Sequence, residues 1–475
     1  MDRGDDTGAD PGHEFTAVDA RRLVDAISQL AQMAGRLLPA QAPPLTIKLR
    51  DHLGVAEQVP NTSATFDPIE QANLQLALDA LHATAAGWDE IGLSSELSHY
   101  GGVSLTAFVA GTFHGPGESA RQLVSVQVSK EETITCLVSG IVLTEFDGVP
   151  VAAMVHTSEH RGPQRSLVFE VVAATQQAAD AFLARVTSLM TELNVLRGKV
   201  LSFAFSEYGG FGLAFAGLPA VTRDQVVLPA WQLDAIDEHA IGITELRDQL
   251  VAAGQHLRRG LLLYGPPGTG KTHTVAYLVG RMPDRTTILL GGASVGALGQ
   301  AASLARKLAP ATIVIEDVDL IGMDRGLPGG EHNPMLFQLL NEMDGLAPTD
   351  DVLFVLTTNR ADLLEPALAA RPGRVDQALE IGVPDAAGRR ALFELYLGEP
   401  VDAATLADAV DRTSGVAAAF VKELARRATL RRIRHGGEPG AALAHVVHEM
   451  VRTATPLLRS TLGAGGDSIR RSTDT

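Results

Sequence analysis

The segment that most restricts the fold of this chain is GPPGTGKT, at residues 265–272. It fits the pattern G-x-x-x-x-G-K-[ST], and it lies between the apolar run GLLLY and HTVAYLVGRM, which can form a helix. Glycines at these places let backbone N–H groups turn inward toward a phosphate, and the amino end of the following helix adds positive potential. The sequence therefore predicts an α/β fold built around a phosphate-binding loop.

Two side chains of this loop have predicted roles. Lys271 places a positive charge near the β- and γ-phosphates, and Thr272 offers a hydroxyl to Mg²⁺. ATP and Mg²⁺ are therefore the predicted ligands. The segment predicted to bind the nucleotide comprises Gly265, Pro266, Pro267, Gly268, Thr269, Gly270, Lys271, Thr272 and His273.

An apolar run that ends in carboxylates supplies a second motif. ATIVIEDVD, residues 311–319, ends in Glu316 and Asp317, as expected for a Walker B strand. One carboxylate must hold the hydration shell of Mg²⁺ and another must orient or deprotonate the attacking water. Glu316 and Asp317 are therefore the predicted catalytic carboxylates.

The runs around these motifs predict the domain organisation. GLLLY, TTILLG, ATIVIE and VLFVLTT suit strands buried on both faces of a parallel sheet, whereas residues 123–173 contain Val-, Ile- and Thr-rich runs between helical segments. The predicted parts are a disordered leader (1–15), an α+β domain of unknown role (16–220), an α/β domain (221–384), a helical lid (385–458) and a disordered tail (459–475).

With these motifs in place, residues 225–455 resemble the AAA ATPase family, which includes the proteasomal, membrane-protease and Cdc48-like ATPases. NEMDGL (341–346), TTNR (357–360) and ARPGRVD (370–376) follow in the family's order. The resemblance implies a P-loop core with a small helical lid. It also implies that Ile241 and Gly242 contact the adenine, and that Asn359 positions the water beside the γ-phosphate.

The resemblance further implies assembly into a ring. Arg371 and Arg374 stand where family members reach the ATP of a neighbouring subunit, so a homo-hexamer is expected. The implied function is a mechanochemical ATPase that remodels proteins or complexes, with a protein cargo recruited by the amino-terminal domain.

This sequence departs from the family at several positions. Family members commonly have Asp then Glu at the Walker B end, so Glu316 falls at the magnesium position and Asp317 at the water position. Each differs by one methylene, which moves its oxygens by roughly an ångström and can cost about 100-fold in rate. A slowly hydrolysing, nucleotide-dependent switch or scaffold therefore remains an alternative. Ala418 also stands where glycine is usual, and Val375 and Gln377 replace the usual Phe and Arg.

Composition bears on location and partners. The formal net charge of -17 argues against a broad nucleic-acid-binding surface, although a DNA-handling ATPase remains a second alternative. Cys136 is the single cysteine, no apolar run approaches the roughly 20 residues of a membrane span, and the amino terminus lacks an apolar signal core. The expected location is the cytoplasm.

The stretch that follows TTILL bears on how cargo is moved. In many threading members of the family, this stretch carries an aromatic residue that faces the central pore. Here Gly291–Ser303 contains no aromatic residue, and Val295 and Leu298 are its only sizeable apolar side chains; MDRGLPGGEHNP (323–334) also lacks an aromatic residue. Poor processive unfolding is therefore predicted, with grip by Val295 and Leu298 as the alternative.

Overall fold

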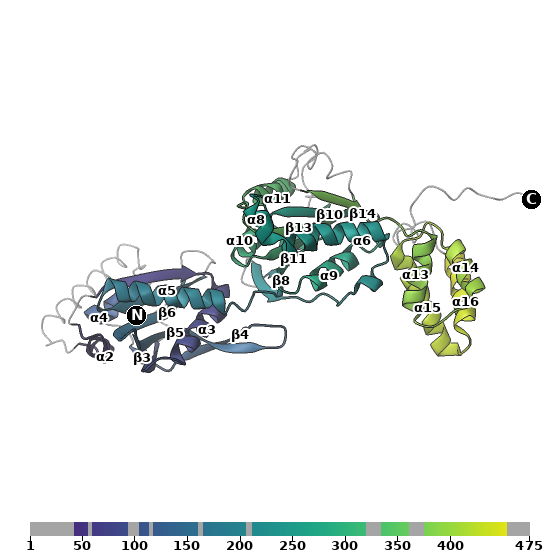
Figure 1. Ribbon diagram of the computed structural model, residues 1–475. Coiled ribbons are helices and arrows are strands. Elements are labelled where there is room, and N and C mark those ends of the chain that lie inside the picture. Colours follow the sequence, from purple (N-terminus) through teal and green to yellow (C-terminus); the bar gives the residue numbers. More distant parts are fainter. Residues whose placement is uncertain are drawn as a thin grey trace, which may run out of the picture. The chain divides into compact units, whose positions relative to one another are not determined.

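The computed structural model describes residues 42–55, 59–93, 104–113, 117–159, 165–205, 211–319, 334–360 and 375–453 (Figure 1). The predicted leader and the predicted tail lie outside these ranges. The chain divides into two compact units. The first comprises Met1–Pro68, Ala77–Val124 and Leu137–Ser188, and the second comprises Ile69–Leu76, Ser125–Cys136 and Leu189–Thr475.

The amino-terminal sheet has the order β1-β7-β6-β5-β2-β3, with β4 paired to β5. The pairs along this order, from β1 to β3, are antiparallel. Its strands are β1 (Asn61–Phe66), β2 (Trp88–Leu93), β3 (Glu118–Ser119), β4 (Gln122–Gln127), β5 (Thr133–Phe146), β6 (Val149–Glu159) and β7 (Arg165–Ala173). The associated helices are α2 (Pro44–Leu53), α3 (Gln71–His82), α4 (Leu105–Ala110) and α5 (Gln176–Glu192).

Both faces of this sheet are covered. Leu49 of α2 and Phe108 of α4 share a buried cluster with Ile141 and Met154 of the sheet. Phe182 of α5 packs on Phe169 of β7, with ring centroids 6.5 Å apart. Because both faces are covered, the central strands β5 and β6 contain continuous buried runs, and the sheet with its packed helices forms an α+β fold.

The second sheet has the order β14-β10-β13-β12-β11-β8-β9. Neighbouring strands are parallel, except that β9 runs antiparallel to β8. The strands are β8 (Val200–Phe205), β9 (Phe211–Phe215), β10 (Arg259–Tyr264), β11 (Thr286–Leu290), β12 (Ala311–Ile315), β13 (Val352–Thr358) and β14 (Gln377–Glu380). The predicted α/β core with a parallel sheet is confirmed.

The boundary predicted at residue 220 needs a correction. β8 pairs with β11, so two strands that precede residue 220 belong to the second sheet. KVLSFAF is recognisable as a strand from its own residues, but its partner is 87 residues away in the register Thr287↔Val200 to Leu289↔Ser202. A local pattern does not identify so distant a partner.

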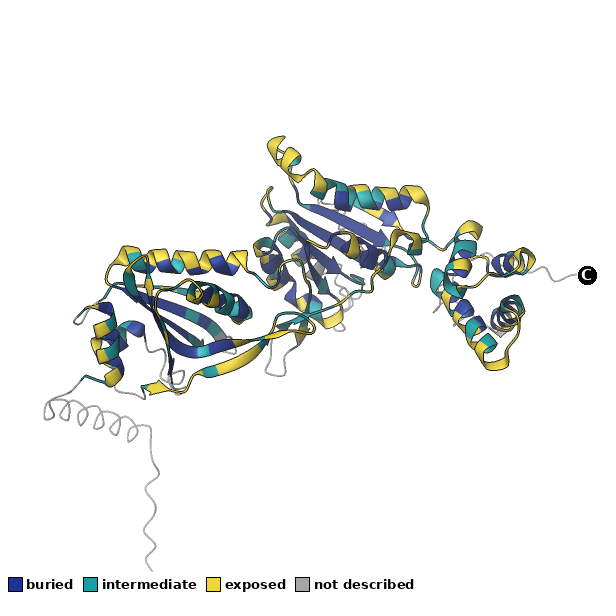
Figure 2. Ribbon diagram, turned by 60° about the horizontal axis from the view of Figure 1, so that its bottom comes forward, coloured by how far each residue is buried: buried dark blue, intermediate teal, exposed yellow. Residues whose placement is uncertain are grey.

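Helices cover both faces of the second sheet (Figure 2). One face packs on α10 (Leu298–Lys307) and α11 (Pro334–Asp344), and the other on α6 (Ala230–Asp237), the π-helix η4 (Glu238–Gly242) and α9 (Lys271–Arg281). Neighbouring residues of one strand alternate between these cores: Leu262 joins the first and Leu261 and Leu263 join the second. Strands buried on both faces explain the continuous apolar runs in the sequence.

The helical part near the carboxyl terminus consists of α13 (Ala386–Leu397), α14 (Ala403–Arg412), α15 (Ala418–His435) and α16 (Pro439–Thr453). Asp385 caps α13 by accepting a hydrogen bond from the Gly388 N–H, and Asp402 caps α14 at the Thr405 N–H. Phe393, Phe420 and Leu443 form its core. This is the helical lid that the sequence predicts. None of the helices in the described ranges is long and apolar enough to cross a membrane.

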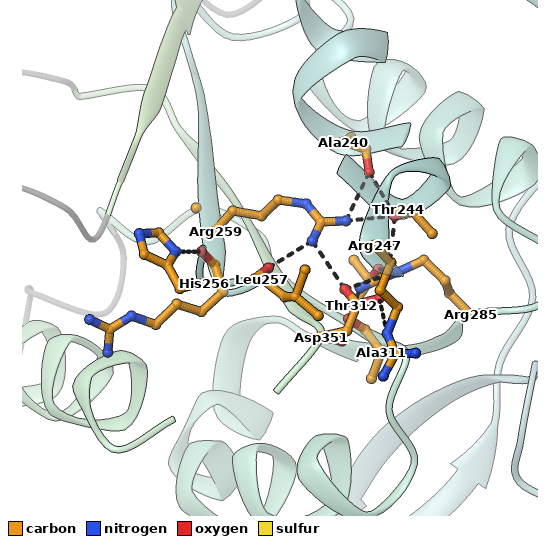
Figure 3. A network of polar contacts seen from close by, with 12 residues as sticks. Ala240, Thr244, Arg247, His256, Leu257, Arg259, Arg285, Ala311, Thr312 and Asp351 are labelled. Atoms are coloured by element: carbon orange, nitrogen blue, oxygen red, sulfur yellow. Dashed lines mark hydrogen bonds and ion pairs between the residues drawn. The ribbon is translucent and has the colours of Figure 1, made fainter. Parts of the chain in front are cut away.

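A buried ionic network fastens the amino-terminal edge of the second sheet (Figure 3). Asp351, just before β13, accepts hydrogen bonds from Arg259 at 3.0 Å and from Arg285 at 2.8 Å. Arg259 also donates to the Thr244 hydroxyl and the Ala240 carbonyl, which ties the helices after α6 to the sheet. Burial, and then the charge of Arg285, lower the pKa of Arg259 to about 10.

The structure of the stretch after β11 does not support the alternative in which Val295 and Leu298 grip cargo, because both side chains are buried. Residues Gly292–Ala297 form a 3-10 helix that leads into α10. Val295 is 2% exposed and Leu298 is 0% exposed, and both belong to the core beside α10. Their side chains serve packing within the domain. The second stretch, 323–334, lies almost entirely outside the described residues.

Candidate functional site

The phosphate loop connects β10 to α9, and its backbone requires glycine at specific positions. Gly265 has φ 145°, and a Cβ there would lie 2.3 Å from the Ile381 carbonyl oxygen. Gly268 and Gly270 have φ values of 75° and 112°. Residues with a Cβ rarely adopt such conformations, so these glycines permit the loop to curl at the carboxyl end of the strand.

Lys271 is the first residue of α9 and is only 7% exposed. Its Nζ donates to the carbonyl oxygens of Gly265 and Pro266 at 2.8 and 2.9 Å, and to Oδ1 of Asn359 at 2.8 Å. Burial lowers the pKa of Lys271, and the charges of Asp317 and Asp319 partly oppose this effect. The ammonium group is thus held inside the loop, where a phosphate would stabilise its charge.

Asn359 and Asp317 meet Lys271 at the carboxyl ends of adjacent strands. Asn359 Nδ2 donates to Asp317 Oδ1 at 3.1 Å, and the Asp317 N–H donates to the Thr357 hydroxyl at 3.0 Å. Asp317 has φ 50°, a left-handed conformation that is uncommon for a residue other than glycine. The structure therefore brings together three of the residues that the sequence singles out.

Asp319 has a position that sequence reasoning missed. Its Oδ1 accepts hydrogen bonds from the Thr358 hydroxyl at 2.8 Å and from the Asn359 N–H at 3.1 Å. It therefore fixes the backbone from which the Asn359 side chain extends. The available signal was the third carboxylate in EDVD, two residues after Asp317.

The oxygen donors near the loop fit a magnesium ion. Glu316 Oε1 is buried and has no hydrogen-bond partner among the described residues, so it retains its capacity to accept. Thr272 is exposed and lines the same cavity as Asp317. Mg²⁺ in nucleotide sites takes few protein oxygens and completes its shell with phosphate and water. Thr272 and Glu316 would hold it here, the latter through water.

A cavity of about 400 Å³ adjoins the loop, within the usual range for small-molecule sites. One wall is the segment Gln225–Leu228, and the other is formed by Leu392, Tyr396, Ala419 and Lys422 of the lid. The Ala419 N–H donates to the Gly268 carbonyl at 2.9 Å, which joins lid and loop directly. Ala418, where glycine is usual, also lines the cavity.

Ile241 and Gly242, predicted to contact the adenine, are not among the described residues that line this cavity. Ile241 is 8% exposed and packs in the core beneath α6 and α9. Gln225–Leu228 occupies the corresponding wall. Ile241 and Gly242 match the family in their local sequence, but the Ile241 side chain is buried in the packing of η4.

Two further predicted residues cannot be placed. Arg371 and Arg374 lie outside the described residues. Val375, next to them, packs partly buried against the core beside α10 and α11.

A phosphate loop at the end of a parallel strand, with a carboxylate and an asparagine at the ends of the neighbouring strands, defines a P-loop nucleotide-binding domain. The family model for the ATPase family associated with various cellular activities (AAA) matches residues 261–383. The chain therefore carries an AAA ATPase domain.

Several curated proteins are similar to this chain. The ATP-dependent zinc metalloprotease FtsH of Rhodococcus erythropolis is 34% identical over 248 residues, which are 48% of this chain and 29% of that protein. FtsH of Mycobacterium tuberculosis is 33% identical over 264 residues, 51% of this chain and 35% of that protein. The proteasome-activating nucleotidase of Methanopyrus kandleri is 39% identical over 194 residues, 37% of this chain and 43% of that protein. The chain thus spans less than half the length of each of these relatives.

Proposed function

We propose that this chain binds Mg-ATP and hydrolyses it, and that it works as a ring-forming ATPase that remodels proteins or complexes. The observation that carries the proposal is the chain of contacts from Lys271 through Asn359 to Asp317 at the mouth of the phosphate loop. These contacts support the proposal, because a cation that could bind the phosphates and a carboxylate that could orient the attacking water lie close together.

The residues divide the reaction as follows. Lys271 and the loop N–H groups hold the phosphates, and the wall Gln225–Leu228, with Leu392 and Tyr396 of the lid, encloses the rest of the nucleotide. Asp317 orients or deprotonates the water, and Asn359 keeps that water in line beside the phosphate. Magnesium, held by Thr272 and Glu316, would neutralise charge that develops on the phosphate oxygens.

The ring and the cargo are further parts of the proposal. Arg371 and Arg374 would reach the nucleotide of a neighbouring subunit, which requires a closed assembly such as a homo-hexamer. Two relatives are an ATP-dependent zinc metalloprotease and a proteasome-activating nucleotidase. Both names refer to proteolysis, in which the substrate is a protein. We infer a protein cargo, recruited through the amino-terminal α+β unit. A cytoplasmic location remains a prediction from the sequence.

A slowly hydrolysing switch is the second candidate, favoured by the Glu316-Asp317 order. The Asp317 side chain is one methylene shorter than the glutamate that is usual at this position. Its backbone is in the left-handed region, and its carboxylate already accepts a hydrogen bond from Asn359. If that hydrogen bond persists with ATP bound, Asp317 would activate water only weakly. The chain would then act through whether its site holds ATP, and not through repeated hydrolysis.

The test is Asp317→Asn in a purified chain, with Asp284→Asn as a control at an exposed turn position. Binding of a fluorescent ATP analogue should be unchanged, while phosphate release should fall at least about 100-fold, as on removing a positioned base. Wild-type turnover that is itself no faster than the Asp317→Asn variant would favour the switch.

A further inference from the structure

His273, the residue after Thr272 in α9, lines the candidate nucleotide cavity. Its ring Nε2 lies 3.1 Å from the carbonyl oxygen of Gln225, within hydrogen-bond distance. Both residues line the cavity, and Gln225 begins the wall that continues to Leu228. His273 therefore joins the phosphate-loop helix α9 to the first residue of the wall Gln225–Leu228.

The same segment is fastened to α9 a second time. The Tyr277 hydroxyl, one helical turn after His273, donates to both carboxylate oxygens of Asp237 at 2.9 Å. Arg223, two residues before Gln225, pairs with Asp237 and with Asp234 of α6. Tyr277 and Asp237 thus anchor the outer end of the segment, whereas His273 is the contact at its cavity end.

The segment also carries the path into α6. Pro229 caps α6 directly after Leu228, and Trp231 is the second residue of that helix. Gln232 donates to the Glu380 carbonyl at 2.8 Å, so α6 is joined to the end of β14. A shift of the wall toward or away from the phosphate loop would therefore also move the first residues of α6.

We propose that His273 is a positioning residue that holds the wall Gln225–Leu228 at a fixed distance from the phosphate loop and couples nucleotide occupancy to the start of α6. This rests on the proposed function. A nucleotide must contact Lys271 with its phosphates and the wall with its remaining part at the same time. A wall that is already in place avoids the entropic cost of ordering it on binding.

This role predicts a specific kinetic pattern. Loss of one hydrogen bond that preorganises the cavity should weaken ATP and ADP alike, by about 5-fold to 10-fold. Turnover at saturating ATP should stay within about 2-fold, because within the described part of the chain His273 forms no hydrogen bond with Asp317 or Asn359. A residue that merely stabilised the fold would lower the unfolding temperature without this separation of binding from turnover.

Tryptophan fluorescence offers a second readout. The chain has 2 tryptophans, and Trp231 is 64% exposed at the start of α6. The other, Trp88, lies in β2 of the amino-terminal sheet. Nucleotide addition should change the emission of Trp231 in a Trp88→Phe background, and His273→Ala should remove most of that change.

The experiment compares four variants in the full chain, with mant-ATP and mant-ADP as binding probes. His273→Ala and the shorter polar His273→Asn should both weaken binding, and His273→Gln should restore it to within about 2-fold, since its amide can reach the same carbonyl. His256→Ala is the matched control: the ring Nδ1 of His256 lies 3.0 Å from the Arg258 carbonyl, but the residue is exposed and does not line the cavity.

Unchanged nucleotide affinity in a folded His273→Ala or His273→Asn variant would overturn the inference, as would a loss of turnover with affinity intact. Failure of His273→Gln to restore binding would count equally against it. If the wild-type chain binds neither probe, the proposed function fails; if the wild type binds both and the His273 variants bind equally well, only the role of His273 fails.

Discussion

Lys271 Nζ donates a hydrogen bond to Oδ1 of Asn359 at 2.8 Å, which joins the phosphate loop after β10 to the end of the adjacent strand β13. The two residues are 88 positions apart in the chain. Their contact exists because β10 and β13 are parallel neighbours, so that the loops after both strands open at the same edge of the sheet.

The first prediction concerns Lys271. Lys271→Ala should reduce ATP affinity by about 2–4 kcal/mol, because a charge-assisted contact to the phosphates is lost. Titration with a fluorescent ATP analogue measures the effect, and Lys307→Ala, an exposed lysine at the end of α10, serves as the control. Equal affinity in the Lys271→Ala and control variants would contradict the assignment of the loop.

The second prediction concerns Asp319, whose carboxylate accepts a hydrogen bond from the backbone N–H of Asn359. Asp319→Ala should lower turnover by roughly 10-fold and leave ATP affinity nearly unchanged, because Asn359 would lose the acceptor for its backbone N–H and drift from the water position. Asp319→Asn keeps a side-chain oxygen and should retain most of the activity. Steady-state phosphate release decides this, and full activity in Asp319→Ala would assign the carboxylate no role in catalysis.

The third prediction concerns stability. Asp351→Asn should lower the free energy of unfolding by about 3–5 kcal/mol, because Arg259 and Arg285 would remain charged and buried without a counter-ion. Both arginine side chains are 2% exposed and the Asp351 side chain is 1% exposed. Urea unfolding measures the change, with Asp248→Asn, whose side chain is 96% exposed, as the control. Equal losses in the two variants would show that the network contributes little.

The fourth prediction tests action between subunits. Arg374→Ala chains and Lys271→Ala chains should each be nearly inactive, but mixing them should restore some turnover. One intact interface can form where a chain with a functional loop meets a chain with functional arginines. Phosphate release by the mixture, measured after subunit exchange, is the readout. A mixture no more active than either parent would argue that Arg374 does not act in trans.

The fifth prediction concerns cargo. Wild-type chain should unfold a stable fluorescent protein with an unstructured tail only slowly, because the described side chains exposed in 291–303 are Gly, Ala, Ser and Gln. Ala293→Phe, at an exposed position of the 3-10 helix, should speed the ATP-dependent loss of fluorescence. Leu298→Ala is expected to act through stability, since Leu298 is buried. Rapid unfolding by the wild type would refute the prediction.

The local elements of this chain were predictable because their signals lie within a few residues. The phosphate loop needs glycine, lysine and threonine at fixed spacing, and the strand runs 133–146 and 165–173 coincide with β5 and β7. Glu316 and Asp317 follow an apolar run directly, so that their place at a strand end is implied by adjacency. Residue type and short-range spacing suffice for such features.

The sequence by itself thus determined the parallel α/β core, the helical lid and the position of the phosphate loop between a strand and a helix. Tertiary structure alone decided that β8 joins the second sheet, that Gln225–Leu228 and not Ile241 lines the cavity, that Leu298 is buried, and that Asp319 supports Asn359. In each case the deciding partner is an atom far away in the chain. Residue spacing records which element a segment can form, whereas burial and hydrogen bonding depend on which elements pack together.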